Sequence, residues 1–240
     1  STDTSKNLIK SRVDFVLVFS VDNANPNGDP GYDNRPRMDA YTGYGFVTDV
    51  CLKRKIRNRL EMIKELADGY DIWVRSGTYL RETLGDSLDI IRKEDEYKKL
   101  KTDKDKANYE RRRLCEQFFD IRAFGGVLTS DSESEGEEVQ ATNTQKKTKS
   151  KVSQIRGPVS IQYAKSVAPI VVEDDEITRV CPTKPDPKKP DKQTEMGRKK
   201  RVPFAVYVAK GSVSARLAEG DKGTGFSDED LNLLKEAMKT

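Results

Sequence analysis

Clustered lysine and arginine side chains are the groups in this sequence best suited to chemistry, and the chemistry they suit is the binding of phosphate. Residues 51–65 hold six Lys/Arg against two Asp/Glu, and residues 179–201 hold nine against three. Such side chains bind phosphate oxygens through charge-assisted hydrogen bonds. For a polyanion, this local density matters more than the net charge of +4. The pattern predicts a surface that holds a phosphate backbone.

Residues 22–46 are rich in Asn, Gly, Pro and Asp and predict a long functional loop. Asn27 and Gly28 tolerate left-handed backbone angles, and a turn of this kind can offer N–H groups to phosphate oxygens. Arg35 and Arg37 add bidentate donors. We expect all but Gly28 to contact a phosphate backbone, although a purely structural turn is the alternative.

Three acidic residues in the same loop, Asp29, Asp33 and Asp39, raise a second possibility. Carboxylates could hold a metal ion that assists the cleavage of a phosphate backbone, which makes a metal-dependent nuclease the alternative function. The sequence contains no histidine, which is the commonest metal ligand and neutral-pH base. Turn-forming residues surround these acids, so we favour a structural role for them and expect no catalytic residue, metal or cofactor.

A basic helix follows the loop. Thr48 can cap its start, and Gly69 is the predicted end. Lys53, Arg54 and Arg57 lie beside its buried stripe, and Lys53 and Arg57 are one turn apart, so they can follow successive phosphates. The alternative is an ordinary solvated helix face. The stripe itself consists of Leu52, Ile56, Leu60 and Ile63.

A third basic stretch precedes a late strand. Met196 is a flexible apolar group that could wedge beside an unstacked base. The consecutive cations that follow repel one another unless a polyanion or solvent relieves them, so we expect phosphate contact rather than a solvent-screened flank. These cations are Arg198, Lys199, Lys200 and Arg201.

Two further arginines flank glycines at which a backbone can approach a ligand closely. Arg122 precedes Gly125 and Gly126, and Arg156 precedes Gly157. We expect both arginines to contact the same phosphate ligand. Phe124, between them in sequence, is more often a core residue than a base-stacking one.

The order of elements predicts an α+β fold of ferredoxin-like βαββαβ type. A strand at 13–21 should be covered on both faces, and residues 81–120 should be largely helical. The expected final strand after the last helix is missing. Further strands are predicted at 72–74, 157–163, 170–180 and 202–208, and a helix capped by Ser227 at 227–239.

We expect a single domain over 1–240 with two insertions. Residues 130–152 are charged, almost free of apolar side chains, and predict a mobile loop. Residues 181–201 are proline-rich and basic and predict a protrusion. Three widely spaced cysteines indicate no disulfide framework, and no apolar run reaches the roughly 18 residues of a membrane span. We expect a cytoplasmic location and no membrane partner.

Several short motifs, in order, resemble the backbone subunit of the type I-C CRISPR surveillance complex (Cascade). The resemblance covers about residues 12–236. Each motif is weak alone, and the ordered set is specific. The motifs are Phe15–Phe19, Asn25–Pro30, Arg35–Asp39, Val47–Arg57, Phe119–Arg122, Arg156–Val159 and Met196–Lys199.

The resemblance implies a modified RNA-recognition-motif palm with thumb and finger-like loops and no nuclease activity. It implies that copies stack head to tail along a guide CRISPR RNA, with other Cascade subunits, and present it for pairing with target DNA in antiviral defence. This RNA is then the phosphate backbone that the basic residues are expected to contact, and a metal-dependent ribonuclease of the same superfamily is the alternative. The resemblance also implies that residues 181–201 form the thumb. A protein-interaction module with a basic face is the third alternative.

Overall fold

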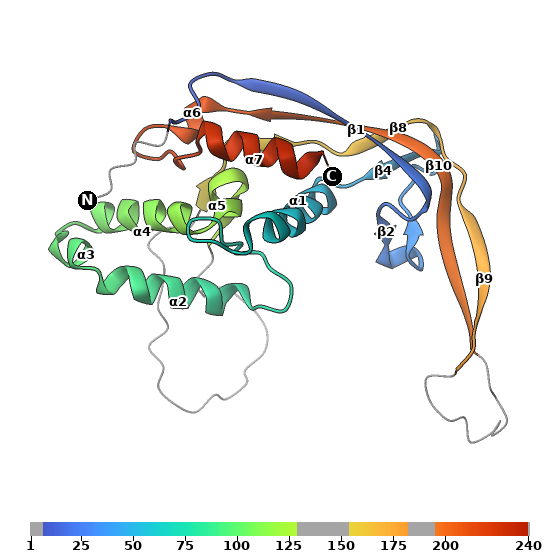
Figure 1. The fold of residues 1–240 in the computed structure, drawn as a ribbon, viewed down its shortest axis with the longest axis horizontal. Coiled ribbons are helices and arrows are strands. Elements are labelled where there is room, and N and C mark those ends of the chain that lie inside the picture. Colours follow the sequence, from blue (N-terminus) through green and yellow to red (C-terminus); the bar gives the residue numbers. More distant parts are fainter. Residues whose placement is uncertain (1–6, 129–153, 182–194, 240) are drawn as a thin grey trace. The chain divides into compact units, whose positions relative to one another are not determined.

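The computed structural model of the 240-residue chain describes residues 7–128, 154–181 and 195–239. It divides into two compact units (Figure 1). The sheet unit comprises Phe15–Lys53 and Ile161–Gly211; the helical unit comprises Ser1–Asp14, Arg54–Ser160 and Ser212–Thr240. No described helix is long and apolar enough to cross a membrane. The predicted loop at 130–152 lies outside the described residues, as do residues 182–194 of the predicted protrusion.

An antiparallel sheet in strand order β1-β10-β8-β4 forms the frame of the sheet unit. Two shorter strands, β7 and β9, also pair with β10. The strands are β1 (Val13–Ala24), β4 (Tyr44–Val47), β7 (Val159–Ile161), β8 (Ala164–Pro169), β9 (Glu173–Arg179) and β10 (Glu195–Val213). The predicted α+β class is confirmed. The run 202–208 belongs to one long strand, and β8, which no pattern predicted, precedes β9.

Strand β1 is covered on one face only, which corrects the prediction that both faces are buried. Phe15, Leu17 and Phe19 point to the covered face, where Phe19 stacks on buried Tyr207 with 5.5 Å between ring centroids. Val16 and Val18 on the other face are 61% and 59% exposed. The alternation of residues therefore predicted the strand correctly. The apolar type of Val16 and Val18 did not mean that the second face of the strand is buried.

The loop after β1 contains short regular elements, so the prediction of one long loop over 22–46 is only partly right. Strands β2 (Gly28–Asp29) and β3 (Arg35–Pro36) pair with each other, and a 3-10 helix, η1 (Pro30–Tyr32), joins them. Asp33 and Asn34 close the turn in the left-handed region at φ 52° and 56°. The loop is a small, defined hairpin.

The helical unit holds most of the helices and its own core. The segment 81–120 is largely helical, as predicted. It is divided among four helices, and the last of them continues to Phe124. The core joins Trp73, Leu88, Leu114, Phe118 and Ile121. The helices of the chain are α1 (Asp49–Lys64), α2 (Leu80–Lys93), α3 (Asp95–Lys99), α4 (Asp103–Gln117), α5 (Phe119–Phe124), α6 (Ala215–Ala218) and α7 (Asp228–Met238).

Two local predictions about this region are wrong. Residues 72–74 form no strand; instead, the backbone N–H groups of Trp73 and Val74 donate to the Asp120 carboxylate at 2.9 and 3.1 Å. Helix α1 ends at Lys64 rather than near Gly69, because Glu65 and Leu66 turn left-handed. By contrast, Ser227 caps α7 as predicted, in a reciprocal capping box with Asp230.

Candidate nucleic-acid interface

The loop after β1 is fastened to the start of α1 by one side chain. Asn27 Oδ1 accepts hydrogen bonds from Thr48 N and Thr48 Oγ1, both at 3.0 Å. Thr48 Oγ1 in turn accepts from Cys51 N at 3.3 Å, which is the predicted cap of the helix. Because its amide oxygen is engaged here, Asn27 positions the loop against the helix end within the sheet unit.

Inside the loop, close packing holds the arginines in place. Arg37 Nη1 pairs with Asp29 Oδ2 at 2.9 Å, and Asp29 Oδ1 accepts from Gly31 N at 3.0 Å. Gly28 cannot carry a side chain, because an added Cβ would lie 1.8 Å from Asn34 Oδ1. Arg35 is exposed on β3. The rigid loop therefore presents Arg35 to solvent and keeps Arg37 half-buried.

The three acids of the loop make separate contacts with the protein. Asp39 accepts hydrogen bonds from Tyr41 N and Thr42 N, led by that of Thr42, and these lower the pKa of its carboxyl. The hydrogen bond from Lys200 Nζ, at 2.7 Å, lowers the pKa of Asp33. Among the residues the structure describes, no three His, Cys, Asp or Glu side chains group as metal ligands. These contacts fit the structural role preferred for the acids.

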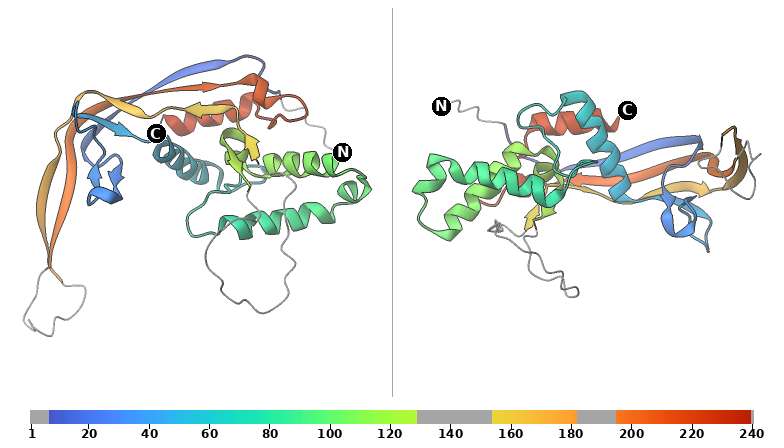
Figure 2. Two further views of the ribbon diagram at one scale, coloured as in Figure 1. Left: turned by 180° about the vertical axis from the view of Figure 1, so that it is seen from behind. Right: turned by 90° about the horizontal axis from the view of Figure 1, so that it is seen from below.

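The basic stretch before residue 202 lies within β10 and faces an acidic strand. In the β9–β10 register, Arg198, Lys199, Lys200 and Arg201 stand opposite Glu176, Asp175, Asp174 and Glu173. Figure 1 and both views of Figure 2 show the two strands running side by side. The sequence interpretation considered only a polyanion or solvent as relief for these cations, and it missed the carboxylate that β9 places opposite each of them.

Two of the four cations are held firmly and two are not. Arg201 pairs with Glu173 and Asp175 at 2.5 and 2.6 Å and also contacts Asn23. Lys200 is 13% exposed and pairs with Asp33. Arg198 is 62% exposed and lies 3.5 Å from Glu176, and Lys199 is exposed. Lys200 and Arg201 thus tie the hairpin to the end of β1 and its loop, while Arg198 and Lys199 face solvent.

Helix α1 contributes cations of two kinds. Lys53, in the sheet unit, pairs with Asp49 one turn earlier at 2.9 Å. Arg57, in the helical unit, is buried and pairs with Asp120 Oδ2 at 2.8 Å. Its guanidinium also lies 5.2 Å from the centre of the Phe124 ring. The prediction that Arg57 contacts phosphate is wrong, because its charge is already compensated inside the protein.

Arg122 is likewise a structural residue, and its predicted contact with RNA is wrong. It is 1% exposed, and its Nε and Nη2 donate to the two carboxylate oxygens of Asp230 at 2.9 and 2.8 Å. Its remaining donors reach the backbone carbonyls of Cys115, Glu116 and Gly69. A guanidinium with every edge occupied in the core cannot reach a ligand.

The glycines near Arg122 and Arg156 leave room for the backbone of this chain rather than for a ligand. Strand β5 (Gly125–Val127) pairs with β6 (Gln154–Arg156). An added Cβ would lie 2.3 Å from Ile155 O at Gly125 and 2.3 Å from Phe124 C at Gly157. The close approach inferred from the glycines is real, but the approaching atoms belong to this chain.

The predicted site residues divide between the two units. The sheet unit holds Asn27, Arg35, Arg37, Lys53, Met196 and the four cations of residues 198–201, and the helical unit holds Arg54, Arg57, Arg122 and Arg156. Met196 and Arg156 are exposed, and Arg54 Nη1 is a buried atom without a hydrogen-bond partner. No prediction used the acidic run 173–176. This run was the feature of the sequence that could have indicated acidic partners for the cations of residues 198–201.

Comparisons with known proteins agree on one family. Residues 11–240 match the family model described as CRISPR-associated protein Cas7. A Haloferax volcanii protein with the same description is 27% identical over 230 residues, 93% of this chain and 62% of that protein. The chain thus spans less than two thirds of the length of this curated relative.

A solved structure supports the fold. A chain of a CRISPR RNA-guided surveillance complex in a pre-nicking state superposes with a TM-score of 0.51 and 16% identity, covering 95% of this chain and 71% of that one. The family match covers nearly the whole chain, the sheet and helices agree with this fold, and the ordered motifs of the sequence are those of the same group. The chain belongs to the Cas7 family of CRISPR-associated proteins.

Proposed function

We propose that this chain binds a guide RNA through the sheet unit, as a structural subunit of an RNA-guided surveillance complex and without cleaving nucleic acid. The observation that carries this proposal is the linkage of three cation-bearing segments within one compact unit. Asn27 joins the loop to the start of α1, and Lys200 joins the loop to the β9–β10 hairpin. Arg35, Lys53, Arg198 and Lys199 are the cations proposed to reach phosphate.

The chemistry of these groups suits a backbone ligand better than a base-specific one. Lysine and arginine bind phosphate oxygens irrespective of sequence, and their binding releases condensed counterions. Met196, 68% exposed on β10, can pack against an unstacked base. A guide-binding subunit must accept any spacer sequence, which agrees with a site built from phosphate contacts.

The finer features follow from the family and from the type I-C resemblance. We propose an RNA-recognition-motif palm in which both units belong to one domain. Copies assemble head to tail along the CRISPR RNA, contact other Cascade subunits and leave the guide free to pair with target DNA. Arg37, Arg54 and Arg156 are secondary candidates for RNA contact.

Neutralising three of the proposed phosphate-binding cations of the sheet unit tests this proposal. The triple variant Arg35→Gln, Lys53→Gln, Arg198→Gln removes three candidate phosphate contacts. Each lost contact should reduce the slope of log affinity against log salt by about 0.7 for single-stranded RNA. The variant should therefore bind a repeat-containing CRISPR RNA more weakly at low salt and depend less on salt, as measured by fluorescence anisotropy.

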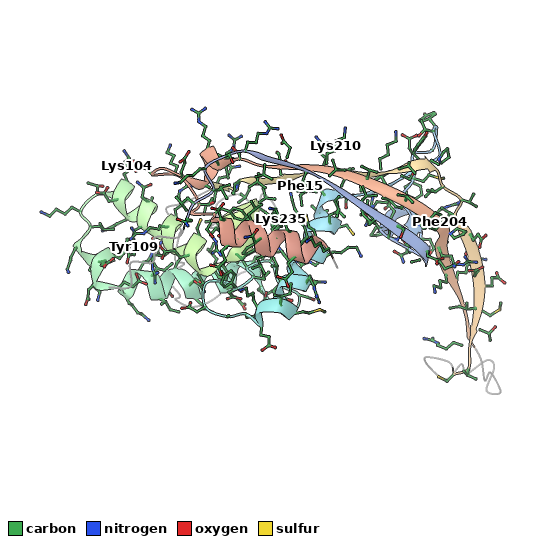
Figure 3. The ribbon with its side chains drawn as sticks, turned by 45° about the horizontal axis from the view of Figure 1, so that its top comes forward. Phe15, Lys104, Tyr109, Phe204, Lys210 and Lys235 are labelled. Carbon is green, nitrogen blue, oxygen red and sulfur yellow. The ribbon has the colours of Figure 1, made fainter. Side chains whose placement is uncertain are left out.

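The matched control is Lys101→Gln, Lys104→Gln, Lys235→Gln, which makes the same charge change on exposed residues of the helical unit; Figure 3 labels Lys104 and Lys235 on helices α4 and α7. This control should retain the wild-type slope. Equal losses in both triples would mean a general charge effect and would overturn the assigned interface. Wild-type protein that fails to bind the RNA would overturn the function.

A further inference from the structure

The β9–β10 hairpin carries equal numbers of opposite charges along its described ion-pair ladder. On one face Arg198 and Lys200 stand opposite Glu176 and Asp174, and on the other Lys199 and Arg201 stand opposite Asp175 and Glu173. A β-strand alternates its side chains between two faces, so each face is separately balanced. Neither face offers a net positive surface to RNA as it stands.

The pairs differ in how easily they can open. Lys200 and Arg201 are largely covered and each contacts a second segment of the unit, the first through Asp33 and the second through Asn23. Arg198 and Glu176 are 62% and 59% exposed and lie 3.5 Å apart. Exposed pairs of this kind are weak, because water competes for both charges. The Arg198–Glu176 pair is therefore the exchangeable member of the ladder.

We propose that Glu176 is a built-in competitor for the RNA phosphate at Arg198, so that RNA binds the hairpin by displacing this carboxylate. The inference rests on the proposed function, since it requires RNA to reach Arg198. A phosphate group offers the guanidinium a bidentate partner, and a polyanion adds the entropy of counterion release, which a side-chain carboxylate lacks. Glu176 thereby weakens binding at this point and discriminates against isolated small anions.

Glu176→Gln is the direct test, because glutamine keeps the shape of the side chain and removes only its charge. An exposed ion pair is worth up to about 1 kcal/mol, which corresponds to about a fivefold change in affinity. The variant should bind a CRISPR RNA about two- to fivefold more tightly than wild type by fluorescence anisotropy. The matched control, Glu82→Gln on exposed α2 of the helical unit, should leave the affinity unchanged.

A double-mutant cycle separates displacement from any loosening of the hairpin. Arg198→Gln should weaken RNA binding at least twofold more in the Glu176→Gln background than in wild type, since Glu176 no longer masks the arginine. An equal loss in both backgrounds, an unchanged or weaker affinity of Glu176→Gln, or an equal gain in Glu82→Gln would each overturn the inference. Wild-type protein that binds no RNA would instead overturn the proposed function itself.

Discussion

At the scale of single residues, the partner of a cation decides whether it is structural or available. Arg122 and Arg57 were predicted to bind RNA, as Arg35 and Arg198 were. Arg122 and Arg57, however, each form an ion pair with a buried carboxylate. Asp230 is 108 positions from Arg122 in sequence. No local pattern could have paired them. Sequence composition therefore finds the cations of this chain, and only the fold tells which ones a ligand can reach.

Replacing Arg122 tests its structural role. Arg122→Met removes the ion-pair partner of Asp230 in the core and leaves it only the hydrogen bonds from Ser227. Removing one partner of a buried ion pair costs about 3–5 kcal/mol. Urea unfolding should show a loss of this size, whereas Arg156→Met, at an exposed site, should change stability by less than about 0.5 kcal/mol. A stable Arg122→Met protein with weakened RNA binding would restore Arg122 to the interface.

Cysteine reactivity provides a second residue-scale test. Burial raises the pKa of Cys115 to about 12, so at pH 8 only about one thiol in ten thousand is the reactive thiolate. Cys181 is exposed. Iodoacetamide at pH 8, followed by mass spectrometry, should label Cys181 rapidly and Cys115 only after unfolding, and labelling of Cys115 should increase as pH rises towards its pKa. Rapid labelling of Cys115 in folded protein at pH 8 would contradict the packing of α4.

At the scale of elements, the sequence predicted those features that depend only on residues close together in the chain. The Thr48 cap, the stripe on α1, the alternation in β1 and the Ser227 capping box each lie within one stretch of sequence, and each is present. In β10 the strand itself was predicted over 202–208, but Phe204 is 65% exposed and the next buried residues are Ala205, Tyr207 and Ala209. The cross-strand register of β9 and β10 was not predicted, because residues 195–201, which pair with β9, were assigned to the protrusion rather than to a strand. Register depends on which residues of two segments stand opposite each other. The pairing of acidic β9 residues with basic β10 residues therefore could not be predicted from either segment alone.

Strand β1 offers a matched pair of substitutions on its two faces. Val18→Thr places a hydroxyl in solvent and should alter stability by less than about 0.5 kcal/mol. Val21→Thr places the same hydroxyl at a buried position and should cost about 1–3 kcal/mol. Thermal or urea unfolding of the two variants measures the difference. Equal costs would mean that the outer face of β1 is covered within the folded chain.

At the scale of the whole molecule, the ordered motifs predicted the family, and the family match over residues 11–240 confirms it. The predicted α+β class is also confirmed, with its antiparallel sheet and long β10. The assignment of residues to units was beyond the sequence. The predicted cations fall partly in the sheet unit and partly in the helical unit: the division of α1 between Lys53 and Arg54 separates the cations of that helix, and Arg122 and Arg156 lie in the helical unit as well. The proposed interface is accordingly confined to the sheet unit.

Photo-crosslinking to a CRISPR RNA containing 4-thiouridine, with the crosslinked peptides identified by mass spectrometry, tests this assignment most directly. Crosslinks should concentrate in the loop that bears Arg35 and at the start of β10 around Met196 and Arg198. Crosslinks confined to helices α2, α3 and α4 of the helical unit would contradict the proposed interface.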